Sequence, residues 1–205
     1  MDKAAMYKLT YGLFVLTAKD GIKDNGCIIN TAMQVTTTPN RMIIVVNKQN
    51  YTHDMIQKTK AFNVSCLSED VTFDIFQHFG FQSGRDVDKM QDRAYPRAEN
   101  GIVYIPEMTS AYISGKVISE TDMGTHTMFL ADVTDARILS EQEPVSYSYY
   151  QKHVKPAPKP VKKTSWVCKI CGYVYEGEEL PEDFICPICK HPASDFEKKE
   201  EEKKQ

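Results

Sequence analysis

Four of the six cysteines in this chain lie in two Cys-x-x-Cys pairs near its C-terminal end, Cys168/Cys171 and Cys186/Cys189, with fourteen residues between the pairs. Two such pairs can supply four thiolates at tetrahedral geometry, the usual arrangement around zinc or a single iron ion. The spacing therefore predicts a metal site. It does not choose the metal, because zinc ribbons use similar intervals. The surrounding segment is too small to fold on a hydrophobic core alone, so we expect the metal to provide much of its folding free energy.

A segment rich in proline and lysine precedes this metal-binding module. Residues 151–165 contain three prolines and five lysines, and few side chains that a core could bury. This composition is typical of a stiff linker, which at about 3.1 Å per residue would span roughly 45 Å. We therefore expect one domain over residues 1–150, a linker over 151–165 and a metal-binding module over 166–197. The charged residues 198–205 are expected to be a solvated tail or the frayed end of a helix.

Residues 1–150 consist mainly of short segments rich in β-branched and aromatic residues, and turn residues such as Asp20-Gly21 separate several of them. Helices are expected at about 51–60 and 70–79. There is no internal repeat and no regular alternation of strands with crossover helices. The pattern predicts a mainly β (α+β) fold, an antiparallel barrel with a few helices. The expected strands are 11–18, 26–35, 41–47, 61–67, 110–119 and 127–139.

The chain has no stretch close to the roughly 20 apolar residues that a membrane helix needs. The apolar run at 11–18 is too short for a signal peptide, and no small-residue cleavage site follows it. We therefore expect a cytoplasmic protein that does not associate with membranes, where paired cysteines bind metal more often than they form disulfides. A net charge of −3 gives no reason to expect a nucleic-acid partner. Cys27 and Cys66 lie in apolar, strand-like surroundings and are expected to be small buried residues.

Polar residues between the strand at 41–47 and the helix at 51–60 indicate an anion site. Asn50 or Thr52 can cap the helix, whose free N–H groups point outward, and Lys48 adds a positive charge nearby. This arrangement suits a terminal phosphate monoester. An ordinary capped helix after a strand is the alternative.

The strand before this site alternates in character. Asn30, Ala32, Gln34 and Thr36 are expected to share one face, because successive side chains of a strand point to opposite sides. Polar side chains interleaved with a small one suit a flat polar ring lying along the strand. A solvent-exposed strand face is the alternative.

The residues around the cysteine pairs narrow the choice of metal. "CGYVY" after the first pair, "CPIC" at the second, and Trp166, Phe184 and Phe196 around them resemble rubredoxin. The short interval between the pairs, together with His191-Pro192 and the Glu197 after Phe196, is similar to the rubredoxin-like module at the end of rubrerythrins. The resemblance implies one iron ion bound by Cys168, Cys171, Cys186 and Cys189, with structural zinc as the alternative.

Three segments of the first domain resemble the flavin-reductase-like family of FMN-binding split barrels. They are "NGCIINTAMQVTTTPNRMIIVVNKQNYTHDMI" (25–56), "FGFQSGRDVDKM" (79–90) and "GTHTMFLADV" (124–133). They occur in the family's order and the likeness covers nearly all of residues 5–140. The resemblance implies an FMN cofactor, NAD(P)H as the electron donor and a homodimer.

The same resemblance implies which residues contact FMN. A first group would border the isoalloxazine ring, a second would hold the ribityl chain and phosphate, and a third would close the site, from the same or the partner subunit. The ring group is Asn30, Thr31, Gln34, Val35 and Thr36. The ribityl and phosphate group is Asn47, Lys48, Asn50 and Thr52. The group that closes the site is Ser83, Gly84, Arg85 and Lys89.

One histidine is a candidate catalytic residue. His126 matches the family histidine near the flavin ring and the nicotinamide site. Thr125 stands where many members have aspartate, which weakens a role for His126 as a charged group or an acid. A structural histidine beside a strand is the alternative. His53 is a candidate neighbour of the phosphate.

The order of the two parts resembles the high molecular weight rubredoxins. That likeness implies electron transfer from NAD(P)H through FMN and iron to an acceptor protein, a flavodiiron protein that reduces oxygen or nitric oxide. One alternative is an electron carrier that another protein reduces. Another is a flavin reductase with a zinc ribbon for docking. The sequence does not choose between NADH and NADPH, or between bound and exchangeable FMN.

Overall fold

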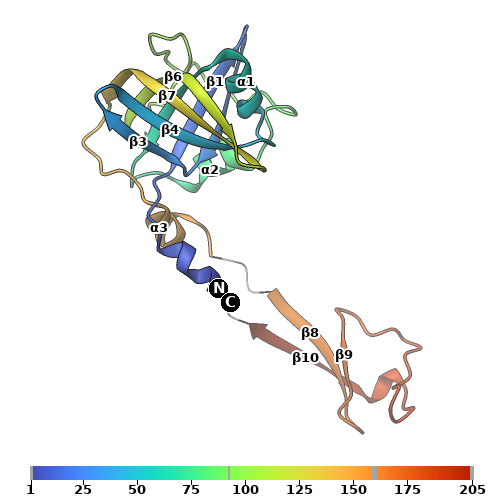
Figure 1. Ribbon diagram of the computed structural model, residues 1–205. Coiled ribbons are helices and arrows are strands. Elements are labelled where there is room, and N and C mark those ends of the chain that lie inside the picture. The colour runs from blue at the N-terminus through green and yellow to red at the C-terminus, as the bar shows by residue number, and fades with distance from the viewer. Residues whose placement is uncertain (1, 92, 158–160, 204–205) are drawn as a thin grey trace. The chain divides into compact units, whose positions relative to one another are not determined.

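The computed structural model describes residues 2–91, 93–157 and 161–203. The chain forms two compact units, Met1–Lys155 and Pro156–Gln205 (Figure 1). None of the helices in the described ranges is long and apolar enough to cross a membrane.

The first unit is built on one seven-stranded sheet in which all neighbouring strands are antiparallel, in the order β2-β1-β5-β6-β7-β4-β3. The predicted antiparallel β fold with a few helices is thus confirmed. The strands are β1 (Phe14–Asp20), β2 (Lys23–Ile29), β3 (Ala32–Thr37), β4 (Asn40–Asn47), β5 (Ala61–Leu67), β6 (Thr109–Asp122) and β7 (His126–Ile138).

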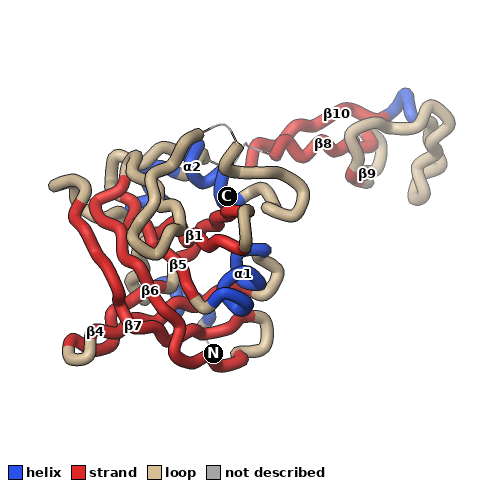
Figure 2. Tube along the Cα trace, turned by 90° about the horizontal axis from the view of Figure 1, so that it is seen from above, coloured by secondary structure: helices blue, strands red, loops and turns tan. Residues whose placement is uncertain are grey.

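The prediction of a single strand over 26–35 is wrong. The chain leaves β2 at Ile29 and enters β3 at Ala32, and these strands lie at opposite edges of the sheet. Only Asn30 and Thr31 join the two edges, so the sheet must curl until its edges meet. The carbonyl of Thr31 accepts a hydrogen bond from the Val45 N–H at 3.0 Å, which fixes the crossing on β4. The result is a barrel, and Figures 1 and 2 show its strands curving around a common interior.

Two helices lie close to the positions expected from the sequence. They are α1 (Tyr51–Thr59) and α2 (Phe73–Gly80). Helix α1 ends at Lys60, whose φ of 58° is left-handed and whose N–H bonds to the Ile56 carbonyl. The shorter helical segments of this unit are η1 (Lys3–Lys8), α3 (Tyr147–Tyr149) and η2 (Tyr150–Val154).

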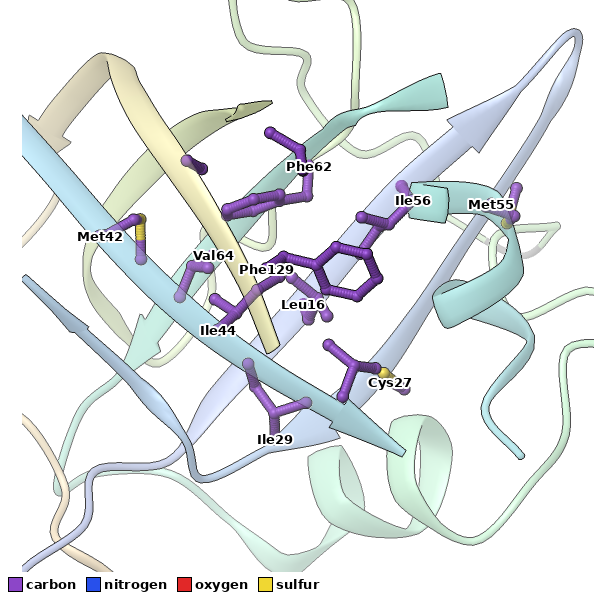
Figure 3. Close-up of a cluster of buried hydrophobic side chains, with 14 residues drawn as sticks. Leu16, Cys27, Ile29, Met42, Ile44, Met55, Ile56, Phe62, Val64 and Phe129 are labelled. Carbon is purple, nitrogen blue, oxygen red and sulfur yellow. The ribbon is translucent and has the colours of Figure 1, made fainter. Parts of the chain in front are cut away.

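The barrel interior is apolar. Side chains of the strands meet Met55 and Ile56 of α1 in one cluster, in which Phe129 is fully buried (Figure 3). Burying each such side chain stabilises the fold by about 1.5–3 kcal/mol. Cys27 is buried in this cluster and Cys66 packs against it, and burial raises the pKa of both thiols to about 11. Both therefore remain protonated and inert.

A buried polar network fastens the loop before β6 onto the barrel. Asn63 is fully buried, and its side-chain N–H groups donate to the carbonyls of Ile102 and Val103 at 2.9 and 3.3 Å. Its oxygen accepts from Ser114 Oγ at 2.7 Å and from Asn100 Nδ2 at 2.8 Å. Buried polar groups that are fully paired in this way fix one arrangement of the chain.

The second unit is a three-stranded sheet in the order β10-β8-β9. Its strands are β8 (Val161–Cys168), β9 (Val174–Glu176) and β10 (Phe196–Lys203), and η3 (Ala193–Asp195) precedes β10. Strands β8 and β10 pair along their whole length, from Phe196 opposite Cys168 to Lys203 opposite Val161.

Two boundaries differ from those expected. The linker predicted over 151–165 is helical at its start, where η2 continues to Val154, and enters β8 at Val161. The charged tail over 198–205 is not a helix end in its described part, because residues 198–203 belong to β10. Both segments are polar, so their composition does not predict that they form the paired strands β8 and β10.

Candidate metal centre and cofactor site

The structure brings the four predicted metal ligands together. The Sγ atoms of Cys168, Cys171, Cys186 and Cys189 all lie within 4.8 Å of one another. Cys168 and Cys189 are 3.6 Å apart, and Cys171 and Cys186 are 3.5 Å apart. Metal–sulfur bonds of about 2.3 Å place tetrahedral sulfurs about 3.8 Å apart. The four thiols therefore fit one ion, and their sulfurs are too far apart for disulfide bonds.

The two cysteine pairs sit on matching turns. The Gly172 N–H donates to the Cys168 carbonyl at 2.9 Å, and the Lys190 N–H donates to the Cys186 carbonyl at 3.0 Å. The residue after each pair is left-handed, with φ of 75° at Gly172 and 61° at Lys190. Each turn directs both of its sulfurs to the same point, which explains why two residues separate the ligands of each pair.

The four thiols lie so close together that a cation is needed to stabilise them as thiolates. Burial alone would raise the pKa of Cys186, but N–H groups of Cys189 and Ile188 directed at its sulfur lower that pKa to about 6. At Cys189 the His191 N–H has the same effect, yet burial and the three other thiols together outweigh it and raise the pKa to about 12. Crowded thiols cannot all ionise without a positive charge among them, and a bound metal provides it.

The predicted aromatic residues pack around this centre. Phe184 contacts Phe196 edge to face, with ring centroids 5.4 Å apart, and Trp166 packs against the same cluster. Outside the cluster, Ile170 and Ile188 stand between the ligands of each pair and are 56% and 66% exposed. The ligands thus have a buried aromatic side and an exposed apolar side.

In the first unit, the loop that is predicted to close the flavin site meets the start of α1. Arg85 donates from Nη2 to Asp54 Oδ2 at 2.5 Å, and its guanidinium lies 5.1 Å from the Tyr51 ring centroid. Ser83 Oγ accepts from the Arg85 N–H at 3.1 Å. Residues about thirty positions apart in the sequence are therefore brought together within one subunit.

Gly84 must be glycine at this contact. A Cβ atom there would lie 2.1 Å from Asn25 Oδ1. Asn25 in turn donates from Nδ2 to Thr52 Oγ1 at 3.0 Å, and both residues are buried. Thr52 thus faces the protein interior. Asn50 occupies the N-cap position of α1, where its side chain makes no capping hydrogen bond.

Lys23 and Tyr51 join the cluster that Arg85 forms with Asp54 at the start of α1. The sequence did not indicate either residue. Lys23 Nζ donates to the Gly84 carbonyl at 3.0 Å and lies 4.6 Å from the Tyr51 ring centroid. Lys23 follows a turn at the start of β2 and resembles any surface lysine in the sequence. Only the fold brings it to α1.

Lys89 does not join the cluster. It is 4% exposed, and its Nζ donates to the carbonyls of Gly26 and Phe79 at 2.9 Å each. Removal from water lowers the pKa of this amine. Its contacts tie β2 to α2.

A second group of predicted residues meets where β4 and β7 pair. Asn47 lies opposite His126, and the Lys48 N–H donates to the Thr125 carbonyl at 3.1 Å. Lys48 Nζ is 2.7 Å from Asp122 Oδ1, and this contact together with the Gly124 N–H lowers the pKa of the Asp122 carboxyl. Thr125 Oγ1 is 2.8 Å from His126 Nδ1, so threonine makes the contact to the histidine at the position where aspartate is usual.

His53 connects the two groups. Its side chain is buried, with Nε2 2.9 Å from Thr127 Oγ1 and Nδ1 3.1 Å from Asp54 Oδ1. Since Asp54 also holds Arg85, a continuous hydrogen-bonded chain runs from β7 to the loop after α2. The sequence suggested His53 as a neighbour of the phosphate. In the structure His53 contacts Asp54, and Asp54 rather than His53 contacts Arg85.

Strand β3 does not present one polar face. Ala32 and Gln34 lie opposite the buried Ile44 and Met42, but the register shifts after Gln34 and Thr36 lies opposite Arg41. This β-bulge at Val35 turns Thr36 to the other face, and Asn30 lies before the strand begins, so only Ala32 and Gln34 share the predicted face.

The remaining predicted ring contacts are spread along this strand and the turn before it. Gln34 lines an apolar cavity of about 290 Å³ and donates to Asn40 Oδ1 at 2.8 Å. Val35 is 43% exposed. Asn30 Oδ1 accepts from Thr31 Oγ1 at 2.9 Å, at the crossing beside Val45.

Comparison with known proteins identifies relatives of both units. The family described as flavin reductase like domain matches residues 6–158, and the rubrerythrin, rubredoxin-like domain matches residues 166–197. A high molecular weight rubredoxin of Moorella thermoacetica is 36% identical, over 96% of this chain and 99% of that protein. A ferric-chelate reductase (NAD(P)H) of Archaeoglobus fulgidus is 33% identical, over 73% of this chain and 89% of that protein. The solved structure of the flavin reductase PheA2 in its native state is 28% identical with a TM-score of 0.60, over 71% of this chain and 93% of that one.

Proposed function

Because this chain belongs to the flavin reductase like family and carries a rubredoxin-like domain, we propose that it moves electrons from NAD(P)H through FMN to a thiolate-bound iron and on to an acceptor protein. The flavin reductase relatives support an oxidoreductase, and the two domains together support flavin-based electron transfer. The nicotinamide donor, FMN rather than FAD, iron rather than zinc, and the acceptor are our proposals.

The observation that carries the proposal is the presence of both sites in one chain. When bound, a flavin takes a hydride's electron pair and releases the electrons singly, and a four-thiolate iron accepts one at a time. The four thiols of the second unit fit one ion at tetrahedral spacing. Zinc would fit them equally well but does not change valence, so a redox role for the module requires iron.

The residues of the first unit have matching roles in the proposal. Arg85 and Lys48 would offset the charge of the phosphate, with Asn50 and Ser83 as hydrogen-bond partners. His126, held by Thr125, would lie beside the ring. Their task is to bind and orient, since hydride transfer between two bound rings depends mainly on position.

The outer face of β4 and β7 supports the proposed homodimer. Ile43, Val45, Met128 and Leu130 point away from the barrel interior, and no described segment buries them completely. Asn47 and His126 end the same face. A second copy of the chain would cover these apolar side chains and leave the predicted ring residues at the interface.

The proposed acceptor is a flavodiiron protein, as the likeness to high molecular weight rubredoxins implies. The exposed side chains of Ile170 and Ile188 offer a contact surface beside the metal ligands. Electrons would leave the chain at this side of the second unit.

An anaerobic titration with NADH and with NADPH tests the proposal, with absorbance followed at both cofactors. We expect the flavin and iron bands to bleach in turn. Replacing one ligand, Cys186→Ser, should leave flavin reduction intact and abolish the iron signal, whereas Cys66→Ser is a matched control outside the metal site. Iron absorption that neither nucleotide bleaches would contradict the proposal. Colourless metal with flavin reduction would favour the zinc-ribbon alternative, and bleaching only by a reduced partner protein would favour the carrier.

A further inference from the structure

The interior of the barrel is open at one end, where a cavity of about 290 Å³ enters it. Its lining comes from every strand of the barrel except β2. Strand pairing brings the lining residues together, because Phe14 lies opposite Cys66 and Ile113 lies opposite Ala136. The cavity is therefore a continuation of the core and not a fold of the surface.

The cavity exists because small side chains end the core here. Ala32, Cys66 and Ala136 belong to its lining, at positions where longer apolar side chains would fill the space. At α1, by contrast, Met55 and Ile56 are buried and fill the interior (Figure 3). An apolar cavity of about 150 Å³ can hold benzene. The larger space in this barrel has room for two fused rings.

Two polar side chains of the lining give the cavity a specific hydrogen-bonding pattern. Gln34 Nε2 donates to Asn40 Oδ1 at 2.8 Å, and no other group in the described part of the chain bonds to Gln34 Oε1 or Asn40 Nδ2. A free acceptor and a free donor thus stand next to each other beside an apolar space. A hydroxyl group both donates and accepts, so one hydroxyl can bond to both amides.

We propose that the open end of the barrel binds a small aromatic alcohol of one or two rings. The rings lie in the cavity against Val64, Ile113 and Val133, and the hydroxyl bonds to Gln34 and Asn40. Binding removes apolar surface of both the rings and the barrel from water, which drives association. Small-molecule sites in general combine an apolar cavity with a few polar groups placed in this way.

This site is separate from the predicted flavin site. Of the predicted flavin contacts, all of which the structure describes, Gln34 alone lines the cavity. Lys48, Arg85 and His126 are not part of the lining. Binding of an aromatic alcohol therefore does not depend on the proposed electron transfer.

The test uses 2-naphthol as the probe and naphthalene as the matched molecule without a hydroxyl. Each is titrated by calorimetry into the full-length protein in the presence of excess FMN, so that neither probe occupies the flavin site. We expect both to bind, and 2-naphthol to bind about 3- to 10-fold more tightly, the effect of about one net hydrogen bond.

Three variants locate the probe. Ala136→Phe fills the cavity from an exposed position, so it should abolish binding of both molecules while circular dichroism shows a folded barrel. Thr134→Phe is the matched control, because it adds the same ring to β7 outside the lining and should leave both affinities unchanged. Asn40→Ala should weaken 2-naphthol binding about 3- to 10-fold and leave naphthalene binding unchanged.

Three results would overturn the inference. The first is that neither molecule binds to the unaltered protein. The second is 2-naphthol binding that survives Ala136→Phe, which would place the probe elsewhere. The third is equal affinity for the two molecules, which would remove the role of the hydroxyl. None of these results bears on the proposed function, which the anaerobic titration with nucleotides tests by itself.

Discussion

Replacing Gly84 with alanine should strain the cofactor site in a way that a second substitution relieves. The added Cβ would lie 2.1 Å from Oδ1, 2.5 Å from Cγ and 2.6 Å from Nδ2 of Asn25. Asn25 is 2% exposed and donates to the fully buried Thr52, so it cannot turn aside without leaving both groups unpaired. Overpacking costs about 1–3 kcal/mol and a broken buried hydrogen bond about 1–3 kcal/mol. We expect Gly84→Ala to lower the free energy of unfolding by about 3 kcal/mol.

A double-mutant cycle tests this reasoning. Asn25→Ala alone removes the bond to Thr52 and should cost about 1–2 kcal/mol. With Asn25 gone, the alanine at position 84 has no clash, so the double variant should cost little more than Asn25→Ala alone. The expected coupling energy is at least about 1.5 kcal/mol. Costs that add within about 0.5 kcal/mol would refute the contact.

The assay must report on the barrel. The single tryptophan, Trp166, lies in the second unit, so tryptophan fluorescence does not follow barrel unfolding. Urea unfolding should instead be followed by far-UV circular dichroism. Flavin titration of the same variants shows whether the loop that carries Arg85 has moved, because Gly84→Ala should weaken FMN binding and Asn25→Ala should partly restore it.

Three further outcomes are expected. Asn63→Ala, which breaks the buried network under the loop before β6, should lower the free energy of unfolding by about 2–4 kcal/mol, as measured by urea unfolding. Removing the metal with a chelator should shift the Trp166 fluorescence to that of an unfolded chain and leave the barrel's thermal melt unchanged. Burial and then the bond to Asp135 raise the pKa of Tyr112 to about 12. The stability that Tyr112 contributes is therefore complete below about pH 10 and is lost as the pH rises toward 12. In urea titrations at different pH values, the free energy of unfolding of Tyr112→Phe should not show this alkaline decrease.

Local signals in the sequence identified most elements of the fold. Strands such as 61–67 and the helix that begins at Tyr51 were predictable because their periodicity and turn residues are local properties. The four metal ligands were predictable for a similar reason, since each Cys-x-x-Cys pair sits on one turn that builds its half of the site.

Features that depend on a distant partner were not predictable. The break between β2 and β3 arises because the sheet closes on itself, and nothing in residues 26–35 marks it. Lys89 resembles a surface cation until α2 and β2 enclose it, and Lys23 reaches Tyr51 only through the fold. The bulge at Val35 depends likewise on the register with β4.

The pairing of β8 with β10 shortens the part of the connection that can bend. A free linker over 151–165 would span roughly 45 Å when extended. With Val154 in η2 and Val161 in β8, only the stretch from Lys155 to Val161 joins the units, and a fully extended chain of that length reaches roughly 20 Å. Residues 198–203 of β10 thus hold the segment before the cysteines straight, and removing them would make that segment flexible while leaving Phe196 packed at the metal centre.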